Sequence, residues 1–157
     1  MVAPRGTRRY PATYGDLALV AGRFAAELQR RKIPSGERVV LWGANSAEWI
    51  GFFFGCLLRG VIVVPLDAAG SADFANKVVN DVAPRLIVGD AHLLHSLDTG
   101  TPQIVFSEAE SELPQEPLFP VNEAVTENTP FQIVFTSGTT SEPKGIVHTH
   151  RNVLASL

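Results

Sequence analysis

Hydrophobic positions along the chain follow two different spacings. From Thr13 to Lys32 apolar side chains recur every three or four residues, which predicts an amphipathic helix. Thr13 followed by Asp16 is a typical helix start signal. The segments RVVLWG (38–43) and VIVVPL (61–66) are short, continuous apolar runs rich in β-branched residues, as expected for buried strands.

The rest of the chain continues this alternation. The other expected elements are a helix capped by Asn45 or Ser46 and ending near Arg59, a helix over 71–82 stopped by Pro84, a strand over 85–90, a short helix over 91–97, strands over 103–107 and 131–135, and the first turns of a helix over 149–157. Continuous apolar strands separated by helices indicate a mainly parallel sheet covered by helices on both faces. The predicted fold class is therefore α/β.

The chain has 157 residues, about one domain's worth. We expect an extension over 1–12, an α/β subdomain over 13–106, a connection over 107–130, and a segment over 131–157 with a strand, a loop and the start of a helix. The connection is rich in glutamate and proline with little periodicity, which predicts an exposed loop. Its glutamates show no spacing typical of metal ligands.

Composition narrows the functional classes. A net charge of −3 and basic clusters without interleaved aromatics argue against nucleic-acid binding. The single cysteine, Cys56, lies in an apolar run and is expected to pack in the core, as in a protein from a reducing compartment. Residues 1–15 lack the apolar stretch of a secretory signal, so we expect a cytosolic protein.

The apolar stretch over 49–66 is long enough to resemble a membrane span. Arg59 and Gly60 divide it into a helical part and a β-branched part of strand length, so we predict a helix stop followed by a buried strand and no transmembrane segment. The spacing of Gly51 and Gly55 then indicates close helix packing in the core.

The segment TSGTTSEPKG (136–145) combines hydroxyls, glycines and one lysine. Gly138 and Gly145 permit backbone conformations that gather N–H groups into a concavity, and the hydroxyls add donors suited to anionic oxygens. Lys144 adds a mobile positive charge. These features predict a polyphosphate site, although Lys144 precedes Gly145 and so departs from the usual nucleotide-hydrolase loop. A surface loop with a chance run of small residues is the alternative.

The stretch IVFTSGTTSEPKGIVHTHRN resembles the phosphate-binding signature of the adenylate-forming (AMP-binding) superfamily, which includes acyl-CoA synthetases, peptide synthetase adenylation domains and luciferases. The stretches GERV, NSAEW, VVPLD and VAPRLIVGD are also similar to the amino-terminal part of these enzymes. The resemblance covers about residues 12–95 and 124–157. The segment GIVHTHRNVLASL is more similar to fatty-acyl or aryl-CoA ligases than to peptide synthetase domains.

The resemblance implies a reaction in two steps. A carboxylate attacks the α-phosphate of ATP to give acyl-AMP and pyrophosphate, and the thiol of coenzyme A then displaces AMP. It also implies a nucleotide site in which Lys144 stabilises the departing pyrophosphate, with Mg²⁺ held near Thr140 through the phosphates. The residues implied to contact the phosphates are Thr136, Ser137, Gly138, Thr139, Thr140, Ser141, Lys144 and Gly145.

Further expectations concern residues in and after the loop and the two tryptophans. Ser141 stands where the family commonly has glycine, and Glu142 is expected to face solvent. His148 and His150 have no apparent third ligand for a metal, so we expect a structural role for them. Trp42 and Trp49 are expected in the core or in a contact between subdomains.

The resemblance implies that the family's adenine site, much of its acyl pocket and its catalytic lid lie beyond residue 157. The chain resembles roughly the first quarter to third of such an enzyme, so we expect an inactive fragment whose partners are a small carboxylate substrate and the remaining domains. We also expect an exposed sheet surface that favours self-association. The alternatives are a natural short nucleotide-binding or assembly module without catalysis and an unrelated α/β nucleotide-binding domain.

Overall fold

The computed structural model describes residues 11–136 and 142–157, and within them helices alternate with strands. The strands are β1 (Arg38–Gly43), β2 (Ile62–Asp67), β3 (Leu86–Gly89), β4 (Gln103–Val105), β5 (Pro130–Thr136) and β6 (Lys144–Thr149). The helices are α1 (Tyr14–Arg30), α2 (Ala47–Arg59), α3 (Ala72–Val82), α4 (Ala91–Leu94), α5 (Ala109–Glu112) and α6 (His150–Leu154), and a 3₁₀ turn spans Phe106–Glu108. The hydrophobic pattern predicts all of them except β6, the 3₁₀ turn and α5.

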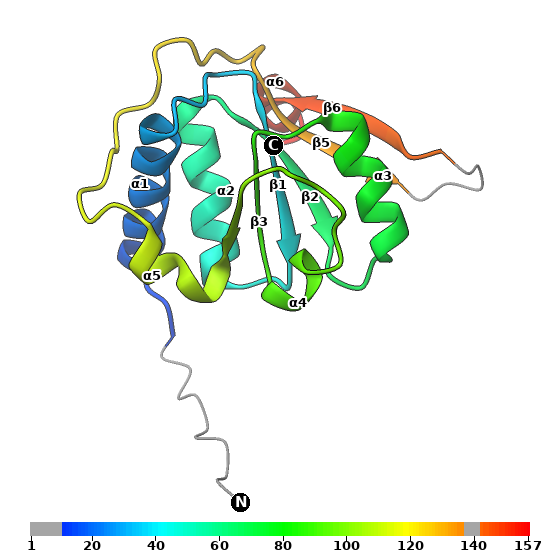
Figure 1. Ribbon diagram of the computed structural model, residues 1–157. Helices are drawn as coiled ribbons and strands as arrows, with labels where there is room; N and C mark the ends of the chain where they lie inside the picture. Colours follow the sequence, from blue (N-terminus) through cyan, green and yellow to red (C-terminus); the bar gives the residue numbers. More distant parts are fainter. Residues whose placement is uncertain (1–10, 137–141) are drawn as a thin grey trace, which may run out of the picture.

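The strands form one layer between two layers of helices (Figure 1). Within the described residues the sheet has six strands in the order β4-β3-β1-β2-β5-β6. Strands β1 to β5 run parallel, and β6 pairs antiparallel with β5. The predicted fold class, a mainly parallel sheet with helices on both faces, is confirmed.

Alternate residues of the strands supply the two halves of the core. Val39 and Leu41 of β1 pack with Phe24 and Phe52 of the helices α1 and α2. Val40 and Trp42 of the same strand pack on the other face against α3. A parallel strand buried on both faces needs apolar residues at every position, which explains the continuous runs in the sequence.

The ends of the first two helices follow the sequence signals. Thr13 and Asp16 form a capping box at the start of α1, and Ser46 rather than Asn45 caps α2. Gly60 ends α2 with φ of 68°, a left-handed conformation that glycine adopts without steric strain. The predicted helix stop at this glycine is confirmed.

The helices α1 and α2 approach each other closely at the two glycines of α2. A Cβ atom at Gly51 would lie 2.5 Å from Val20 Cγ1, and one at Gly55 would lie 2.8 Å from the carbonyl oxygen of Ala21. The prediction of close packing in the core is confirmed.

Cys56 is buried in the same helix, and burial raises the pKa of its thiol above the ordinary value, so the thiol stays protonated. No helix within the described ranges is long and apolar enough to cross a bilayer.

The expectation of an exposed loop over 107–130 is wrong for its first part. Ala109 and Leu113 are buried, because they pack into the core layer on the α1 and α2 side of the sheet. The buried guanidinium of Arg23 fixes this part to α1: its Nε donates to the carbonyl of Pro114 at 2.7 Å, and its Nη2 donates to those of Glu110 and Leu113 at 2.9 and 3.0 Å. Periodicity over so few residues gives no signal for such an anchor.

Replacement of Arg23 by methionine is expected to lower the free energy of unfolding by about 2–3 kcal/mol, because three carbonyls lose charge-assisted hydrogen bonds. Urea denaturation of the 157-residue chain measures this. Arg85→Met is the matched control, since within the described residues its exposed guanidinium makes no hydrogen bond. Equal effects of the two substitutions would contradict the anchoring role of Arg23.

Candidate functional site

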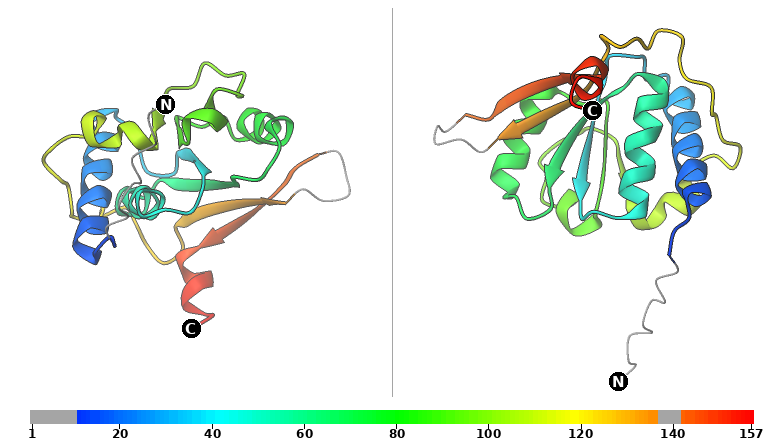
Figure 2. Two further views of the ribbon diagram at one scale, coloured as in Figure 1. Left: turned by 90° about the horizontal axis from the view of Figure 1, so that it is seen from below. Right: turned by 180° about the vertical axis from the view of Figure 1, so that it is seen from behind.

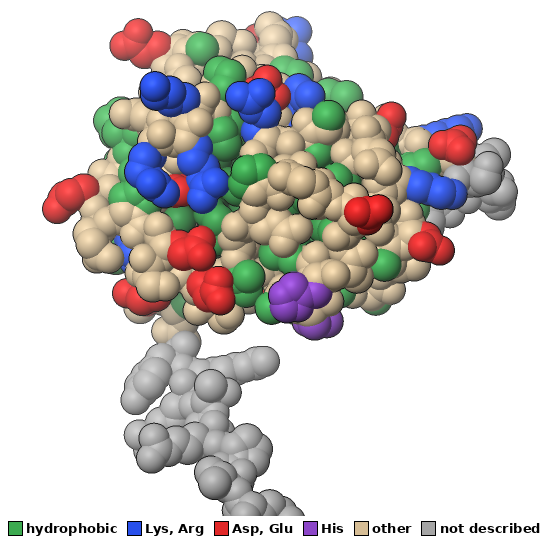
Figure 3. All heavy atoms as spheres, viewed as in Figure 1, with side chains coloured by type: hydrophobic (Ala, Val, Ile, Leu, Met, Phe, Trp, Pro, Cys, Tyr) green, Lys and Arg blue, Asp and Glu red, His purple; other side chains and the backbone are tan. Residues whose placement is uncertain are grey.

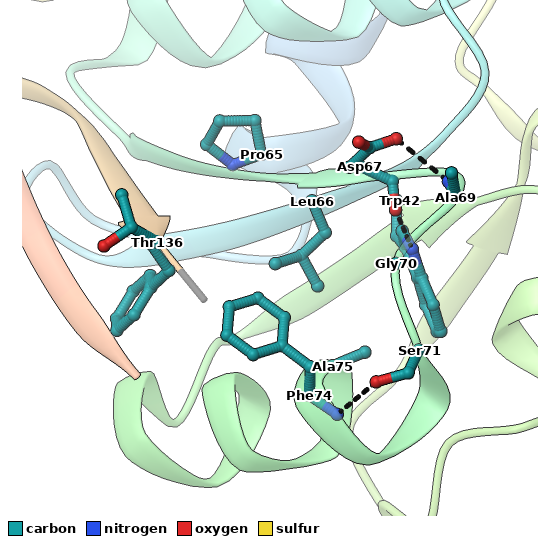
Figure 4. A pocket seen from close by; sticks show the side chains of 11 residues that line it. Trp42, Pro65, Leu66, Asp67, Ala69, Gly70, Ser71, Phe74, Ala75 and Thr136 are labelled. Carbon is teal, nitrogen blue, oxygen red and sulfur yellow. Dashed lines mark hydrogen bonds between the residues drawn. The ribbon is translucent and has the colours of Figure 1, made fainter. Parts of the chain in front are cut away.

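A hollow of about 580 Å³ lies where β1, β2 and β5 reach their carboxyl ends (Figure 4). Its lining residues are Trp42, Pro65, Leu66, Asp67, Ala69, Gly70, Ser71, Phe74, Ala75, Phe135 and Thr136. In parallel α/β sheets, ligands bind outside the carboxyl ends of the strands, because loops and helix starts meet there. This hollow is therefore the candidate site.

Three hydrogen bonds hold the lining in place, and all are drawn in Figure 4. The indole Nε1 of Trp42 donates to the carbonyl of Asp67 at 2.9 Å. The carboxylate of Asp67 accepts from the backbone N–H of Ala69 at 2.9 Å, and the hydroxyl of Ser71 caps α3 by accepting from the N–H of Phe74. The wall nearest α3 is thus fixed by the fold, and Trp42 is a core residue as predicted.

The two ends of the predicted phosphate loop are brought together beside this hollow. Thr136, the last residue of β5, lines the hollow, and its partner across the hairpin is Lys144, the first residue of β6. Among the described residues, the exposed side chain of Lys144 forms no ion pair or hydrogen bond. A mobile cation and a hydroxyl therefore lie on neighbouring strands at the edge of the site. The predicted contacts Ser137, Gly138, Thr139, Thr140 and Ser141 lie outside the described residues.

The expected conformation of Gly145 is wrong. It lies in the extended strand β6 opposite Phe135, and its φ is not positive. A Cβ atom there would lie 2.9 Å from the ring of Phe135 and from Ile133, so the glycine leaves room for these side chains. Glycine composition alone does not distinguish a left-handed turn from a close approach in a strand. Glu142 is exposed, as predicted.

The two histidines after the loop take structural positions. His150 is the first residue of α6, and its ring stacks on Phe131 with centroids 5.1 Å apart. His148 lies in β6. No cluster of three or more potential metal-ligating side chains occurs in the part of the chain that the structure describes.

The hollow itself was not predicted from the sequence. Asp67 directly follows the buried run VIVVPL, and small residues come after it, which is a signal for a loop at the carboxyl edge of the sheet. The contribution of Trp42 and Phe74 to the same hollow depends on the crossover from β2 through α3 to β3, which no local pattern contains.

Comparison with known proteins shows the family to which this chain belongs. A family model described as AMP-binding enzyme matches residues 2–157, and the chain belongs to this family. The resemblance to the adenylate-forming superfamily is therefore confirmed.

Two curated relatives have names that state different activities. D-alanine–D-alanyl carrier protein ligase of Streptococcus pneumoniae is 27% identical over 144 residues, which are 91% of this chain and 28% of that protein. A plipastatin synthase polypeptide of Bacillus subtilis is 30% identical over 141 residues, which are 90% of this chain and 4% of that protein. The chain thus spans less than a third of the length of these curated relatives.

Solved structures share the fold. The inhibitor-bound N-terminal domain of FACL13 from Mycobacterium tuberculosis superposes with a TM-score of 0.75 at 26% identity, over 90% of this chain and 38% of that one. The N-terminal subdomain of Klebsiella oxytoca NpsA gives a TM-score of 0.75 at 23% identity, over 90% of this chain and 36% of that one, which is a likeness of fold alone.

Proposed function

We propose that the chain is the amino-terminal part of an ATP-dependent acid–thiol ligase that forms an acyl-AMP. The observation that carries this proposal is the hairpin that returns Lys144 to Thr136 at the carboxyl edge of the sheet. Membership of the AMP-binding enzyme family supports it. The chain alone is proposed to be inactive, since its relatives are more than three times as long.

The proposed chemistry fits the residues at this edge. A carboxylate oxygen of the substrate forms a bond to the α-phosphorus of ATP, the bond from this phosphorus to the bridging oxygen breaks, and pyrophosphate leaves with the electron pair. Lys144, without a counter-charge among the described residues, neutralises the charge that develops on pyrophosphate. Residues 136–141 and Gly145 would hold the β- and γ-phosphates, and a Mg²⁺ bound through these phosphates near Thr140 would neutralise part of their charge.

For the second step we propose coenzyme A as the acceptor and a fatty or aryl acid as the substrate. The similarity of GIVHTHRNVLASL to acyl-CoA ligases supports this choice. A carrier-protein thiol is the second candidate, and the name of one relative, a carrier protein ligase, favours it. We place the enzyme in the cytosol, where ATP and reduced thiols are abundant.

The acceptor is tested with the polypeptide encoded by the complete reading frame. It is incubated with ATP, Mg²⁺ and one carboxylate at a time, chosen from fatty acids, aryl acids and D-alanine. Coenzyme A or a phosphopantetheinylated carrier protein is then added, and mass spectrometry detects the thioester. Acyl-CoA is the expected product. An acyl-carrier product without acyl-CoA would support the second candidate, and no adenylate with any carboxylate would contradict the proposed activity.

A further inference from the structure

The exposed large hydrophobic side chains are distributed unevenly over the elements of the fold. Among the described residues, the exposed large hydrophobic side chains are Tyr14, Leu19, Ile50, Phe54, Phe119, Val121, Ile146, Val147, Val153, Leu154 and Leu157. They belong to α1, α2, the connection before β5, β6, and α6 with the residues that follow it, and none of them belongs to α3 or α4. On the face viewed in Figure 3, acidic and basic side chains are interspersed and the hydrophobic side chains appear only in small areas.

A groove of about 660 Å³ lies between α1 and α2, and five of these exposed side chains line it: Tyr14, Ile50, Phe54, Phe119 and Val121. The connection before β5 crosses one end of it, where Asn122 N–H donates to the carbonyl of Leu58, and α6 lies beside it (Figure 2, right). The groove is lined by Tyr14, Leu17, Ala18, Ala21, Ile50, Phe54, Leu57, Leu58, Phe119, Val121, Val125 and His150. Apart from the Tyr14 hydroxyl and the His150 ring, these side chains are hydrocarbon.

A groove of this composition is unfavourable in water. Phe54 of α2 is 52% exposed, and Phe119 of the connection before β5 is 51% exposed. A polar side chain at position 54 of α2 would not remove a buried residue from the core. Contiguous apolar surface of this kind is typical of an interface. In addition, Nε2 of His150 is buried and has no hydrogen-bond partner among the described residues.

We propose that the α1–α2 groove is the docking surface for a helix of the polypeptide that follows this chain in the complete enzyme. The inference rests on the proposed function. The part that this chain matches is 38% of the N-terminal domain of FACL13, so that domain is more than twice as long as the matched part. We expect the corresponding additional polypeptide of the complete enzyme to supply the docking helix. The element nearest this additional chain is α6, and its first residue already lines the groove. A helix with one apolar face fits a groove of this shape.

The test is radical footprinting of side chains by mass spectrometry, performed on the complete polypeptide and on residues 1–157. Tyr14, Phe54 and Phe119 are expected to be oxidised at least several-fold more slowly in the complete polypeptide. His92 and His95, exposed at α4, are the control and should react equally in both proteins. Phe54→Asp should lower the melting temperature of the complete polypeptide and leave that of residues 1–157 nearly unchanged.

Each outcome decides the assignment. Equal oxidation of the three aromatic side chains in the two proteins would overturn the docking surface, even if the enzyme forms acyl-AMP. Protection in residues 1–157 that rises with protein concentration would instead assign the groove to a second copy. A reading frame that stops after Leu157 would remove the occupant and would contradict the proposed function as well.

Discussion

Replacement of Lys144 by alanine in the complete enzyme is expected to slow acyl-AMP formation by about 10²–10³-fold, the effect typical of removing one preorganised group that stabilises developing charge. The side chain is exposed at the start of β6 and is not needed for the core, so the melting temperature should change little. Thioester formation from supplied acyl-AMP involves no pyrophosphate and should slow far less. Single-turnover measurement of each step separates them.

Lys32→Ala is the matched control for this prediction. Lys32 is an exposed lysine in the turn after α1, remote from the loop 136–145 in the sequence and outside the hollow. Its replacement should leave both steps at the rates of the unchanged enzyme. Equal slowing of adenylation and thioester formation by Lys144→Ala would show that Lys144 does not act specifically on the departing pyrophosphate.

Replacement of Gly89 by alanine is expected to destabilise the fold by about 3 kcal/mol or more, because it forces a clash between two paired strands. Gly89 of β3 lies opposite Trp42 of β1, and a Cβ atom on it would lie 2.0 Å from the carbonyl oxygen of Trp42. This oxygen belongs to the backbone of a central strand, so it cannot move without disturbing the sheet. The melting temperature should fall by about 6–12 °C for a chain of this size.

Gly100→Ala is the control for the glycine substitution. Nothing lies within 4 Å of the position of a Cβ atom at Gly100, and its φ is not positive. This substitution should therefore be neutral or slightly stabilising, since alanine restricts the unfolded chain more than glycine does. Thermal unfolding followed by circular dichroism compares the two variants. A melting temperature of Gly89→Ala as high as that of Gly100→Ala would contradict the register of β1 and β3.

The fold could be predicted from the sequence because its signals are local. The capping box at Thr13, the stop at Gly60 and the continuous apolar strands each lie within a few residues, and together they give an α/β sheet. The interaction of Arg23 with three carbonyls about 90 positions away has no local pattern and was missed. The same holds for β6, whose residues 144–149 have both polar and apolar members and whose pairing depends on β5.

The candidate site was predicted only in part. The composition of residues 136–145 indicates anion binding, and the structure places Thr136 beside the hollow with Lys144 across the hairpin. The wall formed by Trp42, Asp67 and Phe74 comes from three elements joined only by the sheet topology. Gly145 was expected to help gather N–H groups, but it lies in an extended strand, because a glycine in sequence does not reveal which neighbour it accommodates.

In the proposed function this chain supplies the phosphate-binding loop of an adenylate-forming ligase whose other domains complete the reaction. Carboxylate-dependent ATP–pyrophosphate exchange tests it most directly, measured in parallel for the polypeptide of the complete reading frame and for residues 1–157. We expect exchange by the complete polypeptide with at least one carboxylate and none by residues 1–157. Exchange by residues 1–157 alone, or by neither protein with any carboxylate, would contradict it.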